Sequence, residues 1–299
     1  MTKFDTWLLA HLPRGLVRLS AFLALQAAAC LFALSFLAAI LITRAVWQPD
    51  WPIHRYDALV LIAVGLQALF IWTRLETWEE ARVILLFHLT GTAMEWLKVS
   101  AGSWSYPEPG VLKLFSVPLF TGFMYASVGS YIARAIRLFD IRLAPAPPYW
   151  TVAVLAAAIY VNFWSHHYVA DMRMALFAAT VILFARTRLW FRTLDLWLWV
   201  PVPLVALGAA LMLWGAENIG TLTGTWRYAG QSGWQLVSLS KLGSWYLLLF
   251  VAFATVTLVA RGALRPTAWH PSDEPAQPQH PQRQRGKDQK VEHQPPRKA

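Results

Sequence analysis

The chain has 299 residues, of which 57% are hydrophobic and only 14% are charged, and its formal net charge is +10. Soluble globular domains are nearer 25% charged, so the composition excludes an ordinary soluble domain and indicates an integral membrane protein. The positive charge does not indicate nucleic-acid binding, because eight of the 26 Lys and Arg residues lie at or beyond Arg261 in a Pro- and Gln-rich tail.

Long apolar runs recur from Leu16 to Arg261. A helix needs about 20 mostly apolar residues to cross the hydrocarbon core of a bilayer. We therefore predict an all-α membrane protein with about eight transmembrane helices. The second and sixth are short, and they are either tilted partners of other helices or extended past their flanking charges by snorkelling. The predicted spans are Leu16–Thr43, Ala58–Trp72, Arg82–Val99, Leu114–Ile136, Tyr149–Ser165, Met172–Ala185, Leu196–Gly215 and Leu239–Val259.

The two ends of the chain differ in character. The first apolar run is too long for the h-region of a cleaved signal peptide, so we expect it to stay as a span. Residues 1–265 are predicted to form one polytopic transmembrane domain. Residues 266–299 are predicted to be a disordered, basic, cytoplasmic tail, because their Pro/Gln-rich composition cannot bury a core. The single cysteine, Cys30, excludes an internal disulfide.

The distribution of Lys and Arg predicts the orientation. With the N-terminus inside, 19 of the 26 basic residues fall on the cytoplasmic side and 7 on the outer side. We therefore expect a multi-pass protein of the cytoplasmic (inner) membrane with both termini cytoplasmic. The lipid bilayer is then its surrounding partner, and no nucleic acid is expected.

Two matched motifs lie 122 positions apart: EWLKVSAGSWSY (Glu95–Tyr106) and ENIGTLTGTWRY (Glu217–Tyr228). Both read Glu, six residues, then Gly-x-Trp-x-Tyr. An offset of four spans preserves direction through the membrane, so the motifs are consistent with two parallel four-helix repeats. The alternative is a repeated interface device, in which Gly allows a turn while Trp and Tyr anchor at the headgroups.

The motifs also carry the available chemistry. Two glutamates in one cavity would repel each other, which leaves one protonated beside one ionised and suits general acid–base catalysis. His88 lies almost two helical turns before Glu95 on the same face, and Lys98 is within ion-pair reach of Glu95. Structural roles for these side chains remain the alternative.

A third polar segment, NFWSHHYVADMR (Asn162–Arg173), closes the outer hairpin between the fifth and sixth spans. If it is helical, His167 and Asp171 share a face at a spacing that metal ligands use. No HExxH, HxH or CxxC pattern accompanies them, so we predict no metal site, and the sequence names no cofactor.

These observations favour a membrane-embedded enzyme that acts on a lipid or polyprenoid at the outer membrane face, although the sequence does not establish catalysis. The rivals are a proton-coupled small-molecule transporter and a structural or regulatory membrane subunit. The predicted catalytic residues are Glu95, Glu217, His166, His167 and Asp171, and the predicted substrate-binding residues are His88, Lys98, Trp104, Tyr106, Asn162, Trp226 and Tyr228.

The segments HLTGTAMEWLKVSAGSWSYP, FWSHHYVADMRM and ENIGTLTGTWRY, in that order, resemble an uncharacterised bacterial integral-membrane family, DUF 817. The resemblance covers roughly residues 40–265 and implies a polytopic membrane protein without implying an activity. Glu followed by a Gly-x-aromatic-x-Tyr turn is also similar to the carotenoid hydratases of the bacterioruberin pathway. The rest of that pattern is missing here, so no residue roles are carried over.

Overall fold

The computed structural model of the protein describes residues 12–166, 168–194, 196–230, 235–259, 261–265 and 267–273. The chain divides into two compact units, Met1–Trp269 and His270–Ala299. The second unit has one described element, the short helix η2 (Pro271–Asp273). Residues 274–299 lie outside the described part, so the disorder of the tail stays a prediction.

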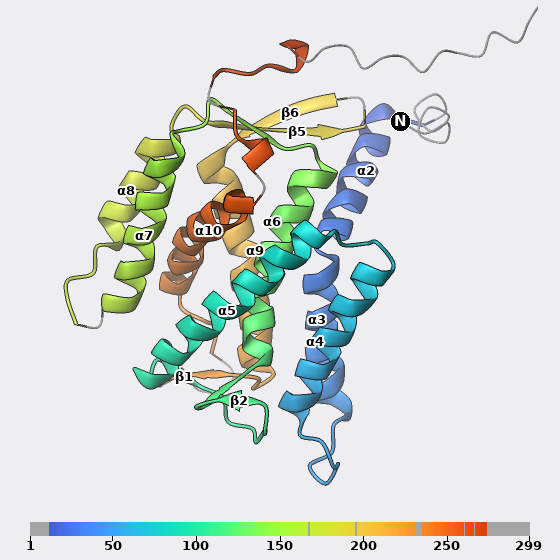
Figure 1. The fold of residues 1–299 in the computed structure, drawn as a ribbon, viewed down its shortest axis with the longest axis vertical. Helices are drawn as coiled ribbons and strands as arrows, with labels where there is room; N and C mark the ends of the chain where they lie inside the picture. The colour runs from blue at the N-terminus through green and yellow to red at the C-terminus, as the bar shows by residue number, and fades with distance from the viewer. Residues whose placement is uncertain are drawn as a thin grey trace, which may run out of the picture. The chain divides into compact units, whose positions relative to one another are not determined.

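The first unit is mostly helical, with short strands between its helices (Figure 1). Its helices are α2 (Arg14–Ala29), α3 (Leu31–Val46), α4 (Arg55–Trp72), α5 (Trp78–Ser100), α6 (Phe120–Leu138), α7 (Tyr149–Ser165), α8 (Arg173–Phe184), α9 (Val202–Leu222), α10 (Leu239–Val259) and the single turn η1 (Arg261–Ala263). Its strands are β1 (Trp104–Ser105), β2 (Lys113–Leu114), β3 (Val117–Pro118), β4 (Arg142–Ala144), β5 (Arg188–Thr193), β6 (Leu196–Pro201) and β7 (Arg227–Tyr228).

Helices α5 and α6 form the most extensive helix pair, and α10 packs against both of them as well as against α7 and α9. Glycine lets α5 and α6 approach closely: a Cβ added at Gly91 would lie 2.6 Å from the Cβ of Tyr125. Small residues at helix contacts serve this purpose in membrane proteins. The main apolar core lies between α7, α8, α9 and α10, and a second core joins α3 and α4 to β1 and α6.

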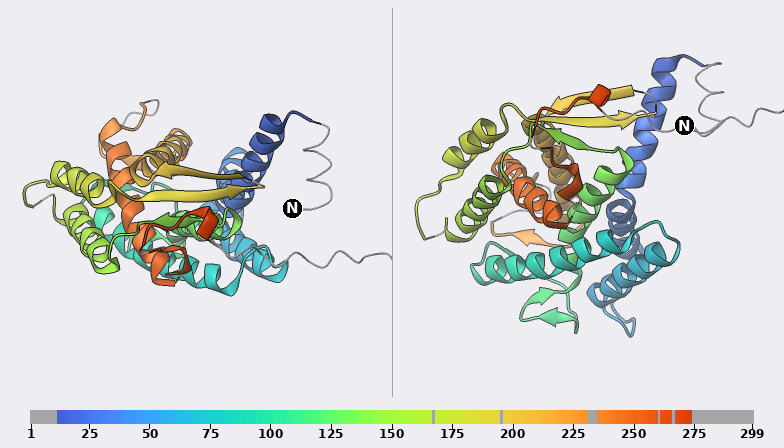
Figure 2. Two further views of the ribbon diagram at one scale, coloured as in Figure 1. Left: turned by 90° about the horizontal axis from the view of Figure 1, so that it is seen from above. Right: turned by 45° about the horizontal axis from the view of Figure 1, so that its top comes forward.

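Small sheets lie at opposite ends of the helices (Figures 1 and 2). Strands β4, β5 and β6 form a three-stranded antiparallel sheet at one end. At the other end β1 pairs with β7, next to the β2–β3 hairpin. The first unit is therefore helical in its body and has β pairing at both of its ends.

Helices occur at all eight predicted positions, and the bounds predicted for the fifth and eighth match α7 and α10 residue for residue. Three predicted spans differ in detail. The first is broken at Cys30, where α2 and α3 meet at a bend of 65°. The fourth and seventh begin as the strands β2–β3 and β6, so their helices start only at Phe120 and Val202. Aromatic and β-branched runs such as RLWFRT and LWLWVP favour strands, and hydropathy alone cannot tell them from a buried helix.

The prediction of eight transmembrane helices is not confirmed. In the described residues, three helices are long and apolar enough to cross a membrane, namely α4, α9 and α10, and the bent α2–α3 pair makes four if it is one span. Helix α8 has 12 residues and spans only about 18 Å at 1.5 Å per residue, short of the ~30 Å of a hydrocarbon core. A membrane location is thus plausible, and the number of crossings is smaller by this criterion than the sequence indicated.

Candidate functional site

The repeated motif forms the same helix ending twice. Helix α5 ends at Ser100 and α9 ends at Leu222, and the glycine two residues later has φ +69° in both cases, at Gly102 and Gly224. In α5 the Gly102 N–H donates to Val99 O and the Ser103 N–H donates to Lys98 O, each at a distance of 3.0 Å. The bonds at the end of α9 are equivalent: the Gly224 N–H donates to Thr221 O and the Thr225 N–H donates to Gly220 O, again at 3.0 Å. This is a Schellman C-cap, which requires the left-handed conformation that glycine adopts without strain.

The two motifs, far apart in sequence, are joined by the β1–β7 pair. Ser105 is paired directly with Arg227, and these residues hold the same place in the two motifs. The pairing is antiparallel, as expected when a local two-fold axis relates two copies of one strand. This geometry agrees with the predicted repeat around the motifs, although it does not extend the repeat to whole four-helix halves.

Glu95 is buried, with 3% of its surface exposed, and its carboxylate accepts three hydrogen bonds. Oε2 accepts from Trp104 Nε1 at 2.7 Å and from Tyr106 OH at 2.7 Å. Oε1 accepts from Tyr125 OH of α6 at 2.9 Å. The aromatic pair of the motif thus binds the acid of the same motif, and the next helix supplies a third donor.

Glu217 is 5% exposed and lies in a similar environment. Its Oε1 accepts from Tyr228 OH, which is equivalent to the bond from Tyr106 to Glu95. Its Oε2 accepts from Trp245 Nε1 of α10 at 2.6 Å. Burial and the neighbouring Glu217 carboxylate raise the pKa of Tyr228 well above its usual value, so this hydroxyl stays protonated and donates. Burial and Glu95 raise the pKa of Tyr106 in the same way.

Aromatic contacts connect the two acids. The rings of Trp104 and Tyr228, one bound to each glutamate, lie 5.6 Å apart in an edge-to-face arrangement. The rings of Tyr125 and Trp245, again one bound to each glutamate, lie 6.3 Å apart. The Trp of the second motif differs from that of the first: Trp226 packs over Gly220 instead of donating to its acid. The two glutamates therefore belong to one aromatic network.

Of the other predicted site residues, Lys98 and His166 lie together at the end of α7, whereas His88 lies apart from them. Lys98 is buried and donates from Nζ to Phe163 O of α7, instead of pairing with Glu95 within the described residues. His166 follows the last residue of α7, and its Nδ1 lies 3.0 Å from the same Phe163 oxygen. Burial and the Lys98 ammonium lower the pKa of His166. His88 lies elsewhere, with its ring 4.4 Å from that of Phe123.

The Asn162–Arg173 segment forms its own polar cluster. Asn162 donates from Nδ2 to Asp171 Oδ1 at 3.2 Å, and its Oδ1 accepts from the Met172 N–H at 2.8 Å. Asp171 binds Arg173 at 2.6 Å, and hydrogen bonds from Asn162 and Arg173 outweigh partial burial to lower the pKa of Asp171. His167 lies outside the described residues, so its predicted catalytic role stays a prediction.

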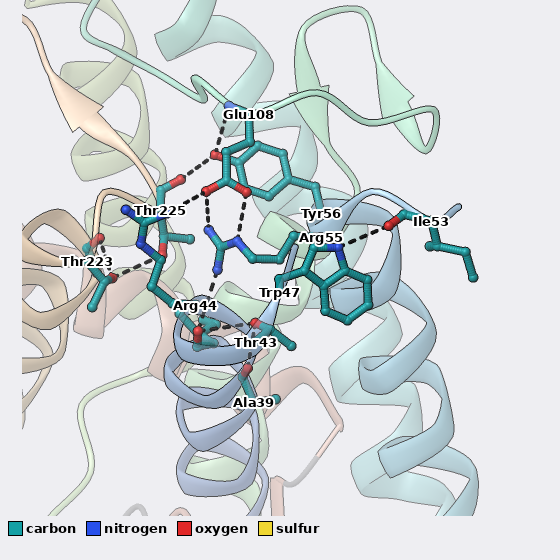
Figure 3. Close-up of polar contacts among 12 residues, drawn as sticks. Ala39, Thr43, Arg44, Trp47, Ile53, Arg55, Tyr56, Glu108, Thr223 and Thr225 are labelled. Atoms are coloured by element: carbon teal, nitrogen blue, oxygen red, sulfur yellow. Dashed lines mark hydrogen bonds and ion pairs between the residues drawn. The ribbon is translucent and has the colours of Figure 1, made fainter. Parts of the chain in front are cut away.

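The loop that follows the first motif is fixed to α4 (Figure 3). Buried Arg55 holds Glu108 through two hydrogen bonds of 2.7 and 2.8 Å. Tyr56, also buried, donates from its hydroxyl to Thr225 O of the second motif at 2.7 Å and lies 3.5 Å from the Glu108 N–H. The second motif and the loop after the first motif therefore contact the same turn of α4.

A mostly apolar pocket of about 180 Å³ lies beside the acids, between α5, α6, α7, α9 and α10. Tyr125 and Trp245, which donate to Glu95 and Glu217, both line it, while the carboxylates themselves do not. One aromatic side chain each, Tyr125 and Trp245, therefore lies between this pocket and the two buried acids.

The family model described as "Protein of unknown function (DUF817)" matches residues 18–253 of this chain. The chain belongs to the DUF817 family. A relative from Bacillus subtilis (strain 168), described as uncharacterized protein YoaT, is 43% identical over 232 residues, which cover 77% of this chain and 87% of that protein. Among solved structures, a cross-linked trimeric variant of MvINS matches with a TM-score of 0.46 and 16% identity, over 62% of this chain and 95% of that one. The local similarity to carotenoid hydratases has no support in these matches.

Sequence reasoning missed several residues of this DUF817 site. Tyr125 and Trp245 were not singled out, because nothing in the sequence shows that α6 and α10 meet at the twin motifs. Lys241, which lies with Nζ 4.2 Å from the Tyr228 ring centroid, was also missed. The signal available was its position in the first turn of the eighth apolar run, where a partly buried cation calls for an explanation.

Proposed function

We propose that this DUF817 protein is a membrane-embedded enzyme that acts on a lipid or polyprenoid chain in the pocket beside Glu95 and Glu217. The observation that supports this most is the double role of Tyr125, which lines the apolar pocket and donates its hydroxyl to Glu95. A phenol in this position can pass a proton between a buried acid and a substrate chain. The reaction class is a double-bond shift in an unsaturated lipid: a proton is added at one carbon and another proton is removed from a neighbouring carbon, so that atoms and charge balance.

In this proposal each residue has a separate task. Glu95 holds or accepts the proton, and Tyr125 transfers it. Glu217 supplies the second carboxylate of the network, held in place by Tyr228 and Trp245. Trp104 and Tyr106 orient Glu95, while Trp226 packs beneath the second motif. The catalytic role predicted for His166 and Asp171, and the substrate-binding role predicted for Asn162, stay part of this proposal; Asn162 and Asp171 are joined by a hydrogen bond of 3.2 Å.

The test compares membranes that contain the wild-type protein, Glu95→Gln, Tyr125→Phe or Glu79→Gln. Glu79 is an exposed residue of the same helix, so its variant controls for removing a carboxylate from α5. Lipid extracts analysed by untargeted mass spectrometry should contain a product that Glu95→Gln and Tyr125→Phe reduce by about 100-fold or more, the contribution typical of acid–base groups. A product that Glu95→Gln leaves at the wild-type level would exclude the proposed chemistry.

The membrane orientation belongs to the same proposal. The charge distribution supports a multi-pass protein of the cytoplasmic membrane with both termini inside and the twin motifs at the outer face. A reporter fused after Pro107 should behave as periplasmic, and one fused after Leu143 as cytoplasmic. A cytoplasmic signal at Pro107 would contradict the orientation.

A proton-coupled transporter is the second candidate, and one observation favours it. Near the C-terminal end of α6, away from Tyr125, Arg134 and Glu76 form an ion pair of 3.0 Å. Their side chains are 2% and 0% exposed. Gln67 and Ser130 also donate to Glu76. Buried ionisable groups in membrane helices often mark proton or substrate paths. Substrate-dependent proton uptake by sealed proteoliposomes, abolished in Glu76→Gln, would favour the carrier over the enzyme.

A further inference from the structure

The hydroxyl groups that line the apolar pocket are hydrogen-bonded, with one exception. The pocket is lined by the hydroxyls of Thr90, Tyr125, Tyr160 and Thr255. The two threonines donate to backbone oxygens of their own helices, each at 2.9 Å. Tyr125 donates to Glu95 at 2.9 Å. Within the described part of the chain, the Tyr160 hydroxyl has no hydrogen-bond partner.

A hydroxyl donor beside an apolar space calls for an acceptor. A tyrosine hydroxyl that is removed from water usually donates a hydrogen bond, because an unsatisfied donor is costly there. The described residues that line the pocket include no Lys, Arg, His, Asp or Glu. The acceptor that suits Tyr160 is therefore a neutral oxygen on the ligand, and a carboxylate or phosphate would find no countercharge in the pocket.

Tyr160 lies towards the same end of the pocket as Tyr125. Lys98 of α5 donates to Phe163 O of α7, which places the two helices against each other at this level. Tyr160 lies three residues before Phe163, about 4.5 Å along α7, and Met94 lies four residues before Lys98, about 6 Å along α5. Met94 lines the pocket and directly precedes the acid that Tyr125 binds. One ligand in the pocket can therefore contact both tyrosines.

We propose that Tyr160 binds the carbonyl oxygen of the lipid in the pocket, so that the substrate is an unsaturated lipid ketone or aldehyde. This inference rests on the proposed function and names the substrate class of the same site. A carbonyl suits the proposed double-bond shift better than a hydroxyl does. It makes a neighbouring C–H bond acidic enough for a carboxylate and a phenol to break, and an isolated double bond does not.

The step balances in atoms and charge. The C–H bond between the carbonyl and the double bond breaks, and Tyr125 takes this proton while it passes its own to Glu95. The electron pair moves onto the carbonyl oxygen, where the Tyr160 O–H stabilises the resulting enolate. Glu95 then returns a proton through Tyr125 to the far carbon of the former double bond. The product is a conjugated carbonyl lipid, and no oxidant or reductant is needed.

The first test measures binding of farnesal and farnesene to the purified full-length protein in neutral detergent. The two probes share one isoprenoid skeleton, and only farnesal carries a carbonyl. We expect farnesal to bind about tenfold more tightly, which corresponds to about 1.4 kcal/mol and is within the contribution of one hydrogen bond. Equal affinities for the two probes would overturn the proposal, and this comparison needs no variant protein.

Variants then assign the preference to one hydroxyl. Tyr160→Phe should remove the preference for farnesal and leave the affinity for farnesene unchanged, which also shows that the pocket is intact. Tyr149→Phe is the matched control, because it removes a hydroxyl from the same helix that donates to Ala254 O at 3.0 Å. The infrared carbonyl stretch of bound farnesal should move to higher wavenumber in Tyr160→Phe only. A preference or a stretch that Tyr160→Phe leaves unchanged would refute the assignment.

The second test follows the proton transfer itself. In heavy water, the wild-type protein should place deuterium on the γ carbons of farnesal, whose C–H bonds the conjugated aldehyde makes acidic. Tyr160→Phe should slow this uptake by about 100-fold, the loss typical of removing one donor to a developing oxyanion. Tyr149→Phe should not slow it. No uptake with the wild-type protein, or equal uptake with Tyr160→Phe, would contradict the enolate step.

The inference and the proposed function fail separately. If the preference for farnesal depends on Tyr160 but Glu95→Gln changes no lipid in membranes, the carbonyl site stands and the acid–base enzyme does not. If a lipid product depends on Glu95 but Tyr160→Phe leaves its yield unchanged, the enzyme stands and Tyr160 is not the carbonyl-binding residue.

Discussion

Replacing Gly220 by Ala should disturb the second motif through a single methyl group. A Cβ at this position would lie 1.8 Å from Trp226 Cη2, with two further ring atoms at 2.3 and 2.4 Å. Carbon atoms in contact are normally about 3.5 to 4.0 Å apart, so the Trp226 ring must move by roughly 2 Å. This ring packs against the buried cluster that contains Tyr56, Trp104 and Tyr106. The displacement therefore extends to the residues that bind Glu95.

The cost follows from the size of the clash. Overpacking of this kind destabilises proteins by about 1 to 3 kcal/mol. At roughly 2 to 4 °C per kcal/mol for a domain of this size, the melting temperature should fall by about 2 to 12 °C. The melting temperature can be measured in detergent by intrinsic tryptophan fluorescence, with size-exclusion chromatography to confirm that the protein stays dispersed.

Gly215→Ala is the matched control in the same helix. Nothing lies within 4 Å of a Cβ added at Gly215, so this variant gains only the better helix propensity of Ala, about 0.5 to 1 kcal/mol. The two substitutions are chemically identical and should shift the melting temperature in opposite directions. If Gly220→Ala is as stable as Gly215→Ala, the packing of Trp226 on α9 is not as described.

Three further predictions concern the helix cap at Gly102, the Arg55–Glu108 ion pair and the titration of His166. Gly102→Ala should cost about 1 to 2 kcal/mol because φ is +69° in open space, whereas Gly102→Asn should cost less; equal stability of the two variants would contradict the cap. Glu108→Ala leaves the Arg55 charge buried and should cost about 3 kcal/mol, and adding Arg55→Met should recover part of that loss; a double variant less stable than the single one would refute this. Burial and the Lys98 ammonium lower the pKa of His166 against the opposing effect of Asp171, so the unfolded chain binds more protons than the folded chain. The stability of the fold should therefore decrease as pH drops below about 6.5. His166→Gln should flatten that dependence in thermal melts at pH 5 to 7, and an unchanged slope would count against the assignment.

The sequence alone determined the helical body and the repeated ending. Hydropathy located all eight helical runs, and α7 and α10 match their predicted bounds, because an apolar run closed by polar residues is a local property of the chain. The spacing from Glu to Gly-x-Trp-x-Tyr correctly indicated one structural unit used twice. A Schellman cap depends only on residues within two turns, so such a unit is visible in sequence.

Only the tertiary structure decided which elements meet. The strands β5 and β6 were predicted as loop and helix, since short aromatic runs fit either state until pairing is known. The partners of the two acids come from α6 and α10, and the pairing of Ser105 with Arg227 joins residues 122 positions apart. Lys98 was expected beside Glu95 because both lie on one helix, yet it reaches Phe163 on α7. Local spacing places a side chain on a face of its helix, and only packing determines which helix that face contacts.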